Sequence, residues 1–128
     1  MSHFVSNGVA RATAVVCDDD PMSRRIVREV LERCGYDVLA GVDNAVDALQ
    51  LVIDHQPDVL VLDLVLNGMS GEEIIASIHD ASDTHVIVHT SYDPSFAVKS
   101  GARLFARKGN IAMLEKQLMR VRGIEVSA

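Results

Sequence analysis

The sequence predicts an α/β domain, a three-layer, doubly wound sheet of five parallel strands with helices on both faces. Short apolar runs rich in valine and isoleucine alternate along the chain with segments whose apolar residues recur at helical spacing. One of these runs, "DVLVLD" at 58–63, is continuously apolar up to its closing carboxylate, as expected of a central strand covered on both faces. This alternation favours parallel strands joined by right-handed helical crossovers.

The five predicted strands are short and mostly β-branched. They cover 13–17 (TAVVC), 36–42 (YDVLAGV), 58–63 (DVLVLD), 85–90 (HVIVHT) and 102–107 (ARLFAR).

The helices are predicted from apolar spacing and from residues typical of helix ends. Pro21 suits the first position of the first helix, with Asp20 as its N-cap, and Gly35 ends that helix. Asp43 or Asn44 can cap the second. The second to fifth helices are expected over 45–53, around 74–78, as a brief, shortened helix around 96–100, and from about 110 to 121.

Length and composition indicate one globular domain. The 128 residues are enough for one domain with one core. From the predicted elements we divide the chain into a leader (1–12), one domain (13–122) and a tail (123–128). The net charge of −6 argues against nucleic acid or an anionic membrane as a partner. Two isolated cysteines, and no signal peptide or membrane-length apolar run, predict a reduced, cytoplasmic setting.

Acidic residues stand at the ends of two predicted strands. Asp18 and Asp19 follow the first strand and Asp63 closes the third; we assign Asp20 no role beyond capping. Ligands of such sheets bind beyond the carboxyl ends of the strands, so these carboxylates should meet in one crevice. Like charges there are costly unless a cation neutralises them, and Mg²⁺ prefers such oxygen ligands. The acidic residues therefore predict a magnesium site that receives a phosphoryl group.

Two further polar residues are predicted at the same rim. Lys108 follows the fifth strand and provides a fixed positive charge, and Thr90 ends the fourth with a hydroxyl that can donate to a phosphoryl oxygen. An aspartate beside a metal, a cation and a hydroxyl is equipped for nucleophilic phosphoryl transfer, because that chemistry depends mainly on positioning and charge neutralisation.

With these motifs the chain resembles the receiver domains of bacterial two-component response regulators, in particular single-domain receivers of the chemotaxis type. The resemblance covers residues 13–122 and rests on "VVCDDDP", "VLVLDLVLNGMSG", "HTS" and "GARLFARKG". It implies a flavodoxin-like strand order, 2-1-3-4-5.

The resemblance also implies a role for each site residue. Asp63 would be the phosphoacceptor, and Thr90 and Lys108 would bind the phosphoryl oxygens. The Mg²⁺ ligands would be Asp18, Asp19, Asp63 and the backbone carbonyl of Val65. Phe105 would be an aromatic switch residue that moves with Thr90, although it reads equally well as a core aromatic.

Three positions depart from the pattern of the family. Asn67 replaces a usual proline in the loop after Asp63, and Gly109 replaces the usual cis-proline after Lys108, where we expect a trans bond. The interval from Thr90 to Lys108 is also shorter than usual by about one helical turn, which suggests output through a different surface or a degenerate fourth helix.

The expected function is a phosphorylatable switch that takes a phosphoryl group from a sensor histidine kinase or a histidine phosphotransfer protein. It would act as a monomer or weak dimer on an unknown downstream protein, and it would not be a turnover enzyme. The alternative is a pseudo-receiver that binds partners without phosphorylation. A haloacid-dehalogenase-type phosphatase is disfavoured because Val65 stands where that family needs a second aspartate, and a nucleotide-binding domain because "CDDDPMSRR" lacks glycines.

Overall fold

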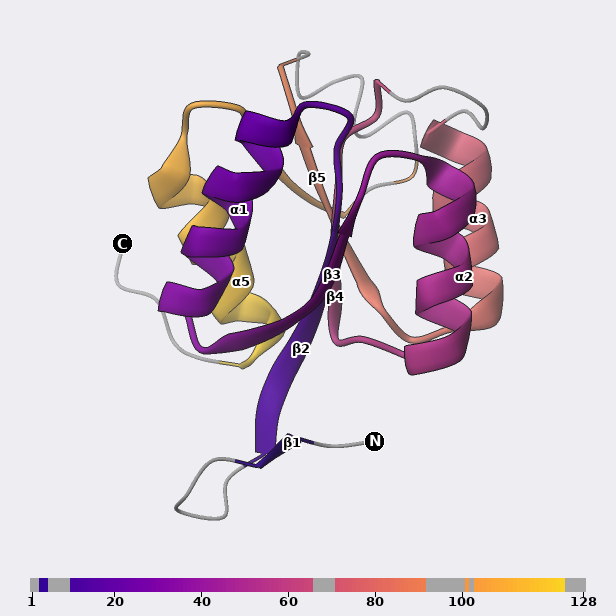
Figure 1. The fold of residues 1–128 in the computed structure, drawn as a ribbon, viewed down its shortest axis with the longest axis horizontal. Helices are drawn as coiled ribbons and strands as arrows, with labels where there is room; N and C mark the ends of the chain where they lie inside the picture. Colours follow the sequence, from indigo (N-terminus) through magenta and orange to yellow (C-terminus); the bar gives the residue numbers. More distant parts are fainter. Residues whose placement is uncertain (1–2, 5–9, 66–70, 92–100, 102, 124–128) are drawn as a thin grey trace.

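Figure 1 shows a central sheet between two layers of helices. This computed structural model describes residues 3–4, 10–65, 71–91, 101 and 103–123. Its parallel strands are β2 (Ala10–Cys17), β3 (Tyr36–Val42), β4 (Val59–Leu62), β5 (His85–Thr90) and β6 (Leu104–Arg107). They pair in the order β3-β2-β4-β5-β6. Counted among the parallel strands alone, this is the predicted order 2-1-3-4-5, so the fold prediction is confirmed.

The described helices cover both faces of the sheet. They are α1 (Pro21–Arg33), α2 (Ala45–His55), α3 (Gly71–Ala81) and α5 (Ile111–Val121). Helices α1 and α5 lie on one face, and α2 and α3 on the other (Figure 1). The shortened fourth helix predicted around 96–100 falls outside the described residues.

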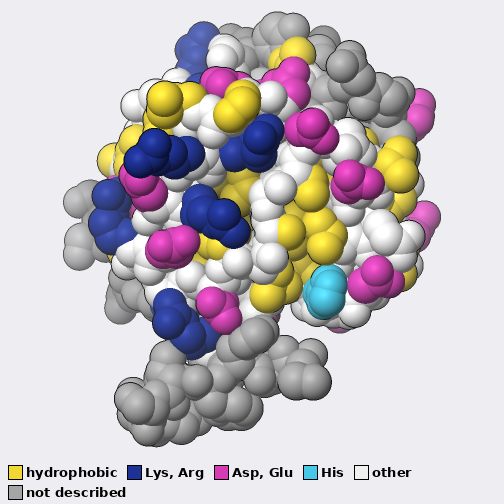
Figure 2. Space-filling model, viewed as in Figure 1, with side chains coloured by type: hydrophobic (Ala, Val, Ile, Leu, Met, Phe, Trp, Pro, Cys, Tyr) yellow, Lys and Arg dark blue, Asp and Glu magenta, His cyan; other side chains and the backbone are white. Residues whose placement is uncertain are grey.

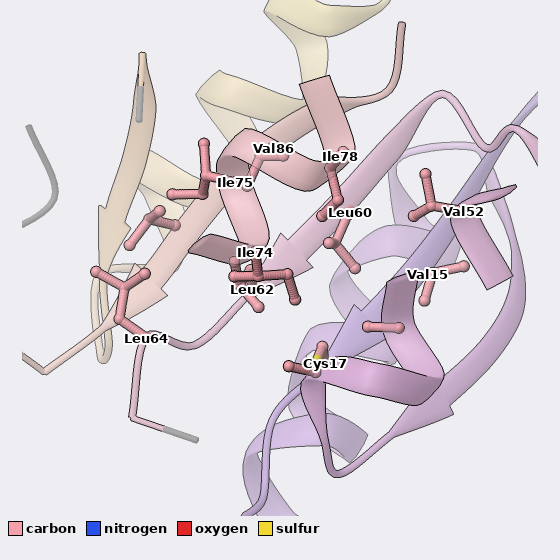
Figure 3. Packing of buried hydrophobic residues seen from close by; sticks show 13 residues of the cluster. Val15, Cys17, Val52, Leu60, Leu62, Leu64, Ile74, Ile75, Ile78 and Val86 are labelled. Carbon is pink, nitrogen blue, oxygen red and sulfur yellow. The ribbon is translucent and has the colours of Figure 1, made fainter. Parts of the chain in front are cut away.

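Each face of the sheet has its own apolar core, because successive strand residues point to opposite sides. In β2, for example, Val15 and Cys17 point to the α2 and α3 side, whereas Ala14 and Val16 point to the α1 and α5 side. Figure 3 shows the first of these cores, where three isoleucines of α3 meet the side chains of β4. The four residues of β4 are all buried, which agrees with the prediction of a central strand.

The helix ends follow the sequence signals. The Asp20 carboxylate accepts the Met22 N–H at 3.1 Å, and Pro21 is the first residue of α1. Asn44, rather than Asp43, caps α2, because its side-chain oxygen accepts the Asp47 N–H at 2.9 Å. Gly35 follows α1 with φ of +86°, a conformation that favours glycine.

The amino-terminal region differs from the expected leader. β2 begins at Ala10 rather than at residue 13, and a two-residue strand, β1 (His3–Phe4), pairs with it in antiparallel orientation. A strand of two residues is too short to have an apolar period, so no sequence pattern predicts it. Residues 10–12 therefore belong to the sheet, while the division into leader, domain and tail stays a prediction.

Two strands are shorter than predicted. Asp58 precedes β4, and its carboxylate accepts the Thr13 N–H at 2.7 Å. β6 covers Leu104–Arg107, and residue 102 of the predicted strand lies outside the described residues. Within the described part of the chain, no helix is long and apolar enough to span a membrane.

Candidate functional site

The site is built at the carboxyl ends of the parallel strands, where the backbone is fixed just beyond the last strand residue. The Asp18 N–H donates to the Val42 carbonyl at 3.0 Å, and the Asp63 N–H donates to the Cys17 carbonyl at 2.9 Å. These bonds continue the strand ladders by one residue. They bring the two carboxylates to the same edge of the sheet.

The three predicted carboxylates do converge. Oxygen atoms of Asp18, Asp19 and Asp63 all lie within 4.8 Å of one another. Asp18 is 2% exposed and Asp63 is 4% exposed, whereas Asp19 is exposed to solvent. Two buried carboxylates at this separation repel each other unless positive charge lies beside them, and the exposed Asp19 leaves a route for a cation from solvent.

Asp18 is held in place by its own loop and by the first turn of α1. Its Oδ1 accepts the Asp20 N–H at 2.9 Å, and its Oδ2 accepts the Ser23 hydroxyl at 2.6 Å. Arg24 Nη1 donates to the Asp18 carbonyl oxygen at 2.7 Å. Ser23 and Arg24 were not predicted as site residues. The available signal was their place in the first turn of α1 after the N-cap, because that turn faces the loop.

Asp63 has a different environment. Its Oδ1 accepts the Val65 N–H at 3.0 Å, and its Oδ2 faces the ammonium of Lys108 at 2.8 Å. Val65 lies beside the site with its side chain 45% exposed. The role of its carbonyl as a metal ligand stays a prediction.

Lys108 connects the two buried carboxylates. Its Nζ lies 2.8 Å from Asp63 Oδ2 and 3.0 Å from Asp18 Oδ2, and its side chain is 23% exposed. Burial lowers the pKa of Lys108, but the hydrogen bonds to Asp63 and Asp18 outweigh that effect, so the pKa is raised overall. The lysine is therefore a permanent positive charge at neutral pH.

Thr90 and Gly109 set the position of the lysine backbone. The Lys108 N–H donates to the Thr90 carbonyl at 2.9 Å, and Thr90 is 3% exposed at the end of β5. The bond before Gly109 is trans, as predicted, and Gly109 has φ of +92°. Proline cannot adopt that φ, so this turn explains the glycine. Lys108 reaches both aspartates without a proline after it.

Phe105 lies on β6 opposite Val88 and packs, partly buried, against the core on the α2 and α3 side. This agrees with its interpretation as a core aromatic, and its role as a switch stays a prediction. Asn67, the other departure from the family pattern, lies outside the described residues.

Two buried titratable residues adjoin the site. Burial, aided by the charges of Asp18, Asp63 and Asp43, raises the pKa of Cys17 to about 12. Burial and the positive charge of Lys108 lower the pKa of His89. Both residues are therefore neutral near pH 7, as expected of core residues.

The donor set fits a hard divalent cation. The three carboxylates supply only oxygen ligands, and two of them are buried. Oxygen ligands favour Mg²⁺ or Ca²⁺ over softer metal ions. Phosphate groups complete such sites when the protein supplies only one or two carboxylates.

Comparison with known proteins agrees with this geometry. The family model described as "Response regulator receiver domain" matches residues 14–125. A protein-glutamate methylesterase/protein-glutamine glutaminase of Natronomonas pharaonis is 34% identical over 87 residues, covering 68% of this chain and 24% of the relative. A putative transcriptional regulator of Pseudomonas aeruginosa is 34% identical over 99 residues, covering 73% of this chain and 48% of the relative. The chain thus spans about half or less of the length of these relatives.

A solved structure gives the same result for the fold. The signal receiver domain of the putative response regulator NarL from Mycobacterium tuberculosis superposes with a TM-score of 0.78 at 27% identity, over 88% of this chain and 98% of that one.

Proposed function

Since the chain belongs to the response regulator receiver domain family, a family of signalling modules rather than turnover enzymes, we propose that Asp63 is its phosphoacceptor. The observation that carries this assignment is the position of Asp63, which is buried, lies in the acidic cluster and faces the Lys108 ammonium at 2.8 Å. The phosphoryl donor is a histidine kinase or a histidine phosphotransfer protein, as the family implies.

The transfer forms one bond and breaks another. A carboxylate oxygen of Asp63 attacks the phosphorus of a phosphohistidine, and an O–P bond forms. The P–N bond breaks, and its electron pair goes to the imidazole nitrogen. That nitrogen then takes a proton from water. Lys108 offsets the negative charge on the phosphoryl oxygens, and the Thr90 hydroxyl donates to one of them. Both contributions are electrostatic, which is the main requirement of phosphoryl transfer.

The cation we propose for this site is Mg²⁺, which Asp18, Asp19, Asp63 and the Val65 carbonyl would hold. When bound, it supplies positive charge to the phosphoryl oxygens. The Ser23 hydroxyl and the Asp20 N–H orient the Asp18 carboxylate toward this role. The Lys108 ammonium lies within 3.0 Å of both Asp18 and Asp63, where it would offset charge on a phosphoryl group carried by Asp63.

The output is a contact with a downstream protein that depends on the phosphorylated state. Thr90 ends β5, and Phe105 lies on the neighbouring strand β6. A phosphoryl group that draws the Thr90 hydroxyl toward Asp63 leaves space into which the Phe105 ring turns. The phosphorylated and unphosphorylated forms then differ in the surface near these two strand ends.

Incubation with a small-molecule phosphodonor and Mg²⁺, followed by intact mass, tests the proposal. We expect the gain of one phosphoryl group in the native protein and none in Asp63→Asn. Native protein that stays unmodified under these conditions would favour the pseudo-receiver, and equal modification of Asp63→Asn would place the acceptor elsewhere.

Metal binding is tested separately by thermal unfolding. Mg²⁺ at about a hundred times its Kd stabilises the folded state by about 2.7 kcal/mol. The increase in Tm should be smaller in Asp63→Asn and in Asp18→Asn. An equal increase in both variants and the native protein would rule out this metal site.

A further inference from the structure

We propose a second ligand site, for a small phosphate monoester, in a groove between α1 and the edge strand β3. The groove has a volume of about 230 Å³. Its lining residues come from β2, α1 and β3, and they are Val16, Pro21, Arg24, Arg25, Arg28, Val38 and Gly41. Three of the seven are arginines, and none of these described lining residues is acidic.

The arginines make the groove attractive to an anion. The Nε atoms of Arg25 and Arg28 lie 3.6 Å from Glu29 and 3.9 Å from Glu32. These ion pairs are solvent-exposed and longer than a hydrogen bond, so they hold the two guanidinium groups weakly and compete little with an anionic ligand. Arg24 Nη1 donates to the Asp18 carbonyl at 2.7 Å, which limits the positions that its guanidinium can take. A groove lined by charge of one sign concentrates ions of the opposite sign.

The surface over α1 is rich in positive charge, although the molecule as a whole is acidic. The chain has a net charge of −6, yet α1 contains four arginines and two glutamates. Figure 2 shows dark blue Lys and Arg side chains over α1, with some magenta Asp and Glu side chains among them, beside a hydrophobic area. The positive charge is therefore local, so it favours a discrete anion over a long polyanion such as nucleic acid.

The remaining lining residues indicate what else the ligand contains. Val16, Val38 and Pro21 are apolar, and Gly41 has no side chain to narrow the groove. A Cβ added at Gly41 would lie 3.7 Å from Arg24 Cδ, inside the space between α1 and β3. The volume is below that of pockets that enclose drug-sized ligands, so the groove matches a ligand smaller than a whole nucleotide. A phosphate with one short apolar or aromatic group fits both the charge and the size.

This inference does not rest on the proposed function, because the groove contains neither Asp63 nor the other predicted metal ligands, and its one contact with that site is the bond from Arg24 to the Asp18 carbonyl. It can be tested in EDTA without a phosphodonor, so its failure leaves the phosphorylation of Asp63 untouched. Bidentate contact with a phosphate is what arginine provides best.

The experiment is an NMR titration of isotope-labelled full-length protein in EDTA with phenyl phosphate and with inorganic phosphate. We expect saturable shifts of the Gly41 amide and of the arginine Nε signals of α1, with phenyl phosphate binding more tightly. Arg28→Gln should weaken phenyl phosphate binding about tenfold, because it removes one charge-assisted contact.

Arg33→Gln is the matched control. It removes the same charge from the same helix, but Arg33 lies away from the groove and pairs with Glu115 of α5 at 3.4 Å. Unchanged affinity in Arg33→Gln supports the site. Equal weakening in both variants, shifts that do not saturate, or equal affinity for phenyl phosphate and inorganic phosphate would overturn it.

Discussion

Lys108 places its ammonium 2.8 Å from the Asp63 carboxylate, although β5 lies between the strands that precede these two residues. The lysine backbone is bonded to the end of β5 through the Thr90 carbonyl, so its side chain extends across that strand end to reach Asp63. The same ammonium lies 3.0 Å from Asp18, beyond β4. One side chain therefore joins the ends of three strands, and its removal should affect both charge and stability.

Lys108→Met should destabilise the protein in the absence of divalent cations. Asp18 and Asp63 are almost fully buried and would lose their positive partner, which we expect to lower the free energy of unfolding by about 1–3 kcal/mol. Mg²⁺ should restore part of this loss, since it replaces the missing charge. Urea unfolding with EDTA and with Mg²⁺ measures both effects.

Arg25→Gln is the control for that variant. Arg25 is exposed on α1, and its removal should change stability by no more than about 0.5 kcal/mol. If Lys108→Met is as stable as Arg25→Gln in EDTA, the ion pairs with Asp18 and Asp63 do not contribute as we infer.

Gly109→Ala should lower the free energy of unfolding by about 1 kcal/mol, and Gly109→Pro should lower it further. The residue has φ of +92°, which strains any side chain, and proline is restricted to φ near about −65°. A Cβ at this position meets nothing within 4 Å, so the cost in Gly109→Ala is conformational rather than steric. Gly41→Ala is the control and should be close to neutral in the same urea unfolding series. At Gly41 φ is not positive, and an added Cβ would make only an ordinary van der Waals contact. Stabilisation by Gly109→Pro would contradict the observed turn.

Cys17 should make the protein less stable as pH rises above about 8.5, the pKa of an unfolded thiol. Burial raises the folded pKa to about 12, so the unfolded state loses a proton in this range while the folded state keeps it. The free energy of unfolding then falls by up to about 1.4 kcal/mol per pH unit from this group.

Cys17→Ala should remove that contribution. Unfolding measured between pH 9 and 11 should show a shallower decline in the variant than in the native protein. Cys34, which is only partly buried, is the control, and Cys34→Ala should change the slope less. Identical slopes in all three proteins would exclude a buried, neutral thiol at position 17.

His89 should make the protein less stable as pH falls below about 6.5, the pKa of an unfolded imidazole. Burial, with the help of Lys108, lowers its folded pKa, so below about pH 6.5 the unfolded state binds a proton that the folded state does not. Stability contributed by the neutral imidazole is present above that pH and is lost as pH falls, by up to about 1.4 kcal/mol per pH unit.

His89→Leu should therefore lose less stability than the native protein between pH 7 and pH 5. Its Nε2 is a buried atom without a hydrogen-bond partner among the described residues, so the leucine variant should also be tolerated at pH 7. His85, exposed on the same strand, supplies the control variant His85→Gln. If the free energy of unfolding falls equally between pH 7 and pH 5 in the native protein and in His89→Leu, His89 is not buried as a neutral base.

Much of the fold was predictable because its signals are local. The continuous apolar run of β4, the proline and aspartate at the start of α1, and the glycine after it each depend on a few neighbouring residues. The two-residue strand β1 was not predictable, since its pairing with Ala10 and Arg11 depends on contact rather than on a period. The choice of Asn44 over Asp43 as the cap of α2 also depended on the tertiary structure, because both side chains can accept a hydrogen bond at a helix start.

The polar residues at strand ends, and therefore the groups that could meet, can be read from the sequence: Asp18, Asp19, Asp63, Thr90 and Lys108. The distances between them depend on the folded chain, because the order of strands across the sheet brings Lys108 over the end of β5 to Asp63. The tertiary structure also decided that Ser23 and Arg24 hold Asp18 and that Gly109 turns with a positive φ. Strand and helix periods arise from neighbours along the chain, whereas these contacts arise from packing between distant segments.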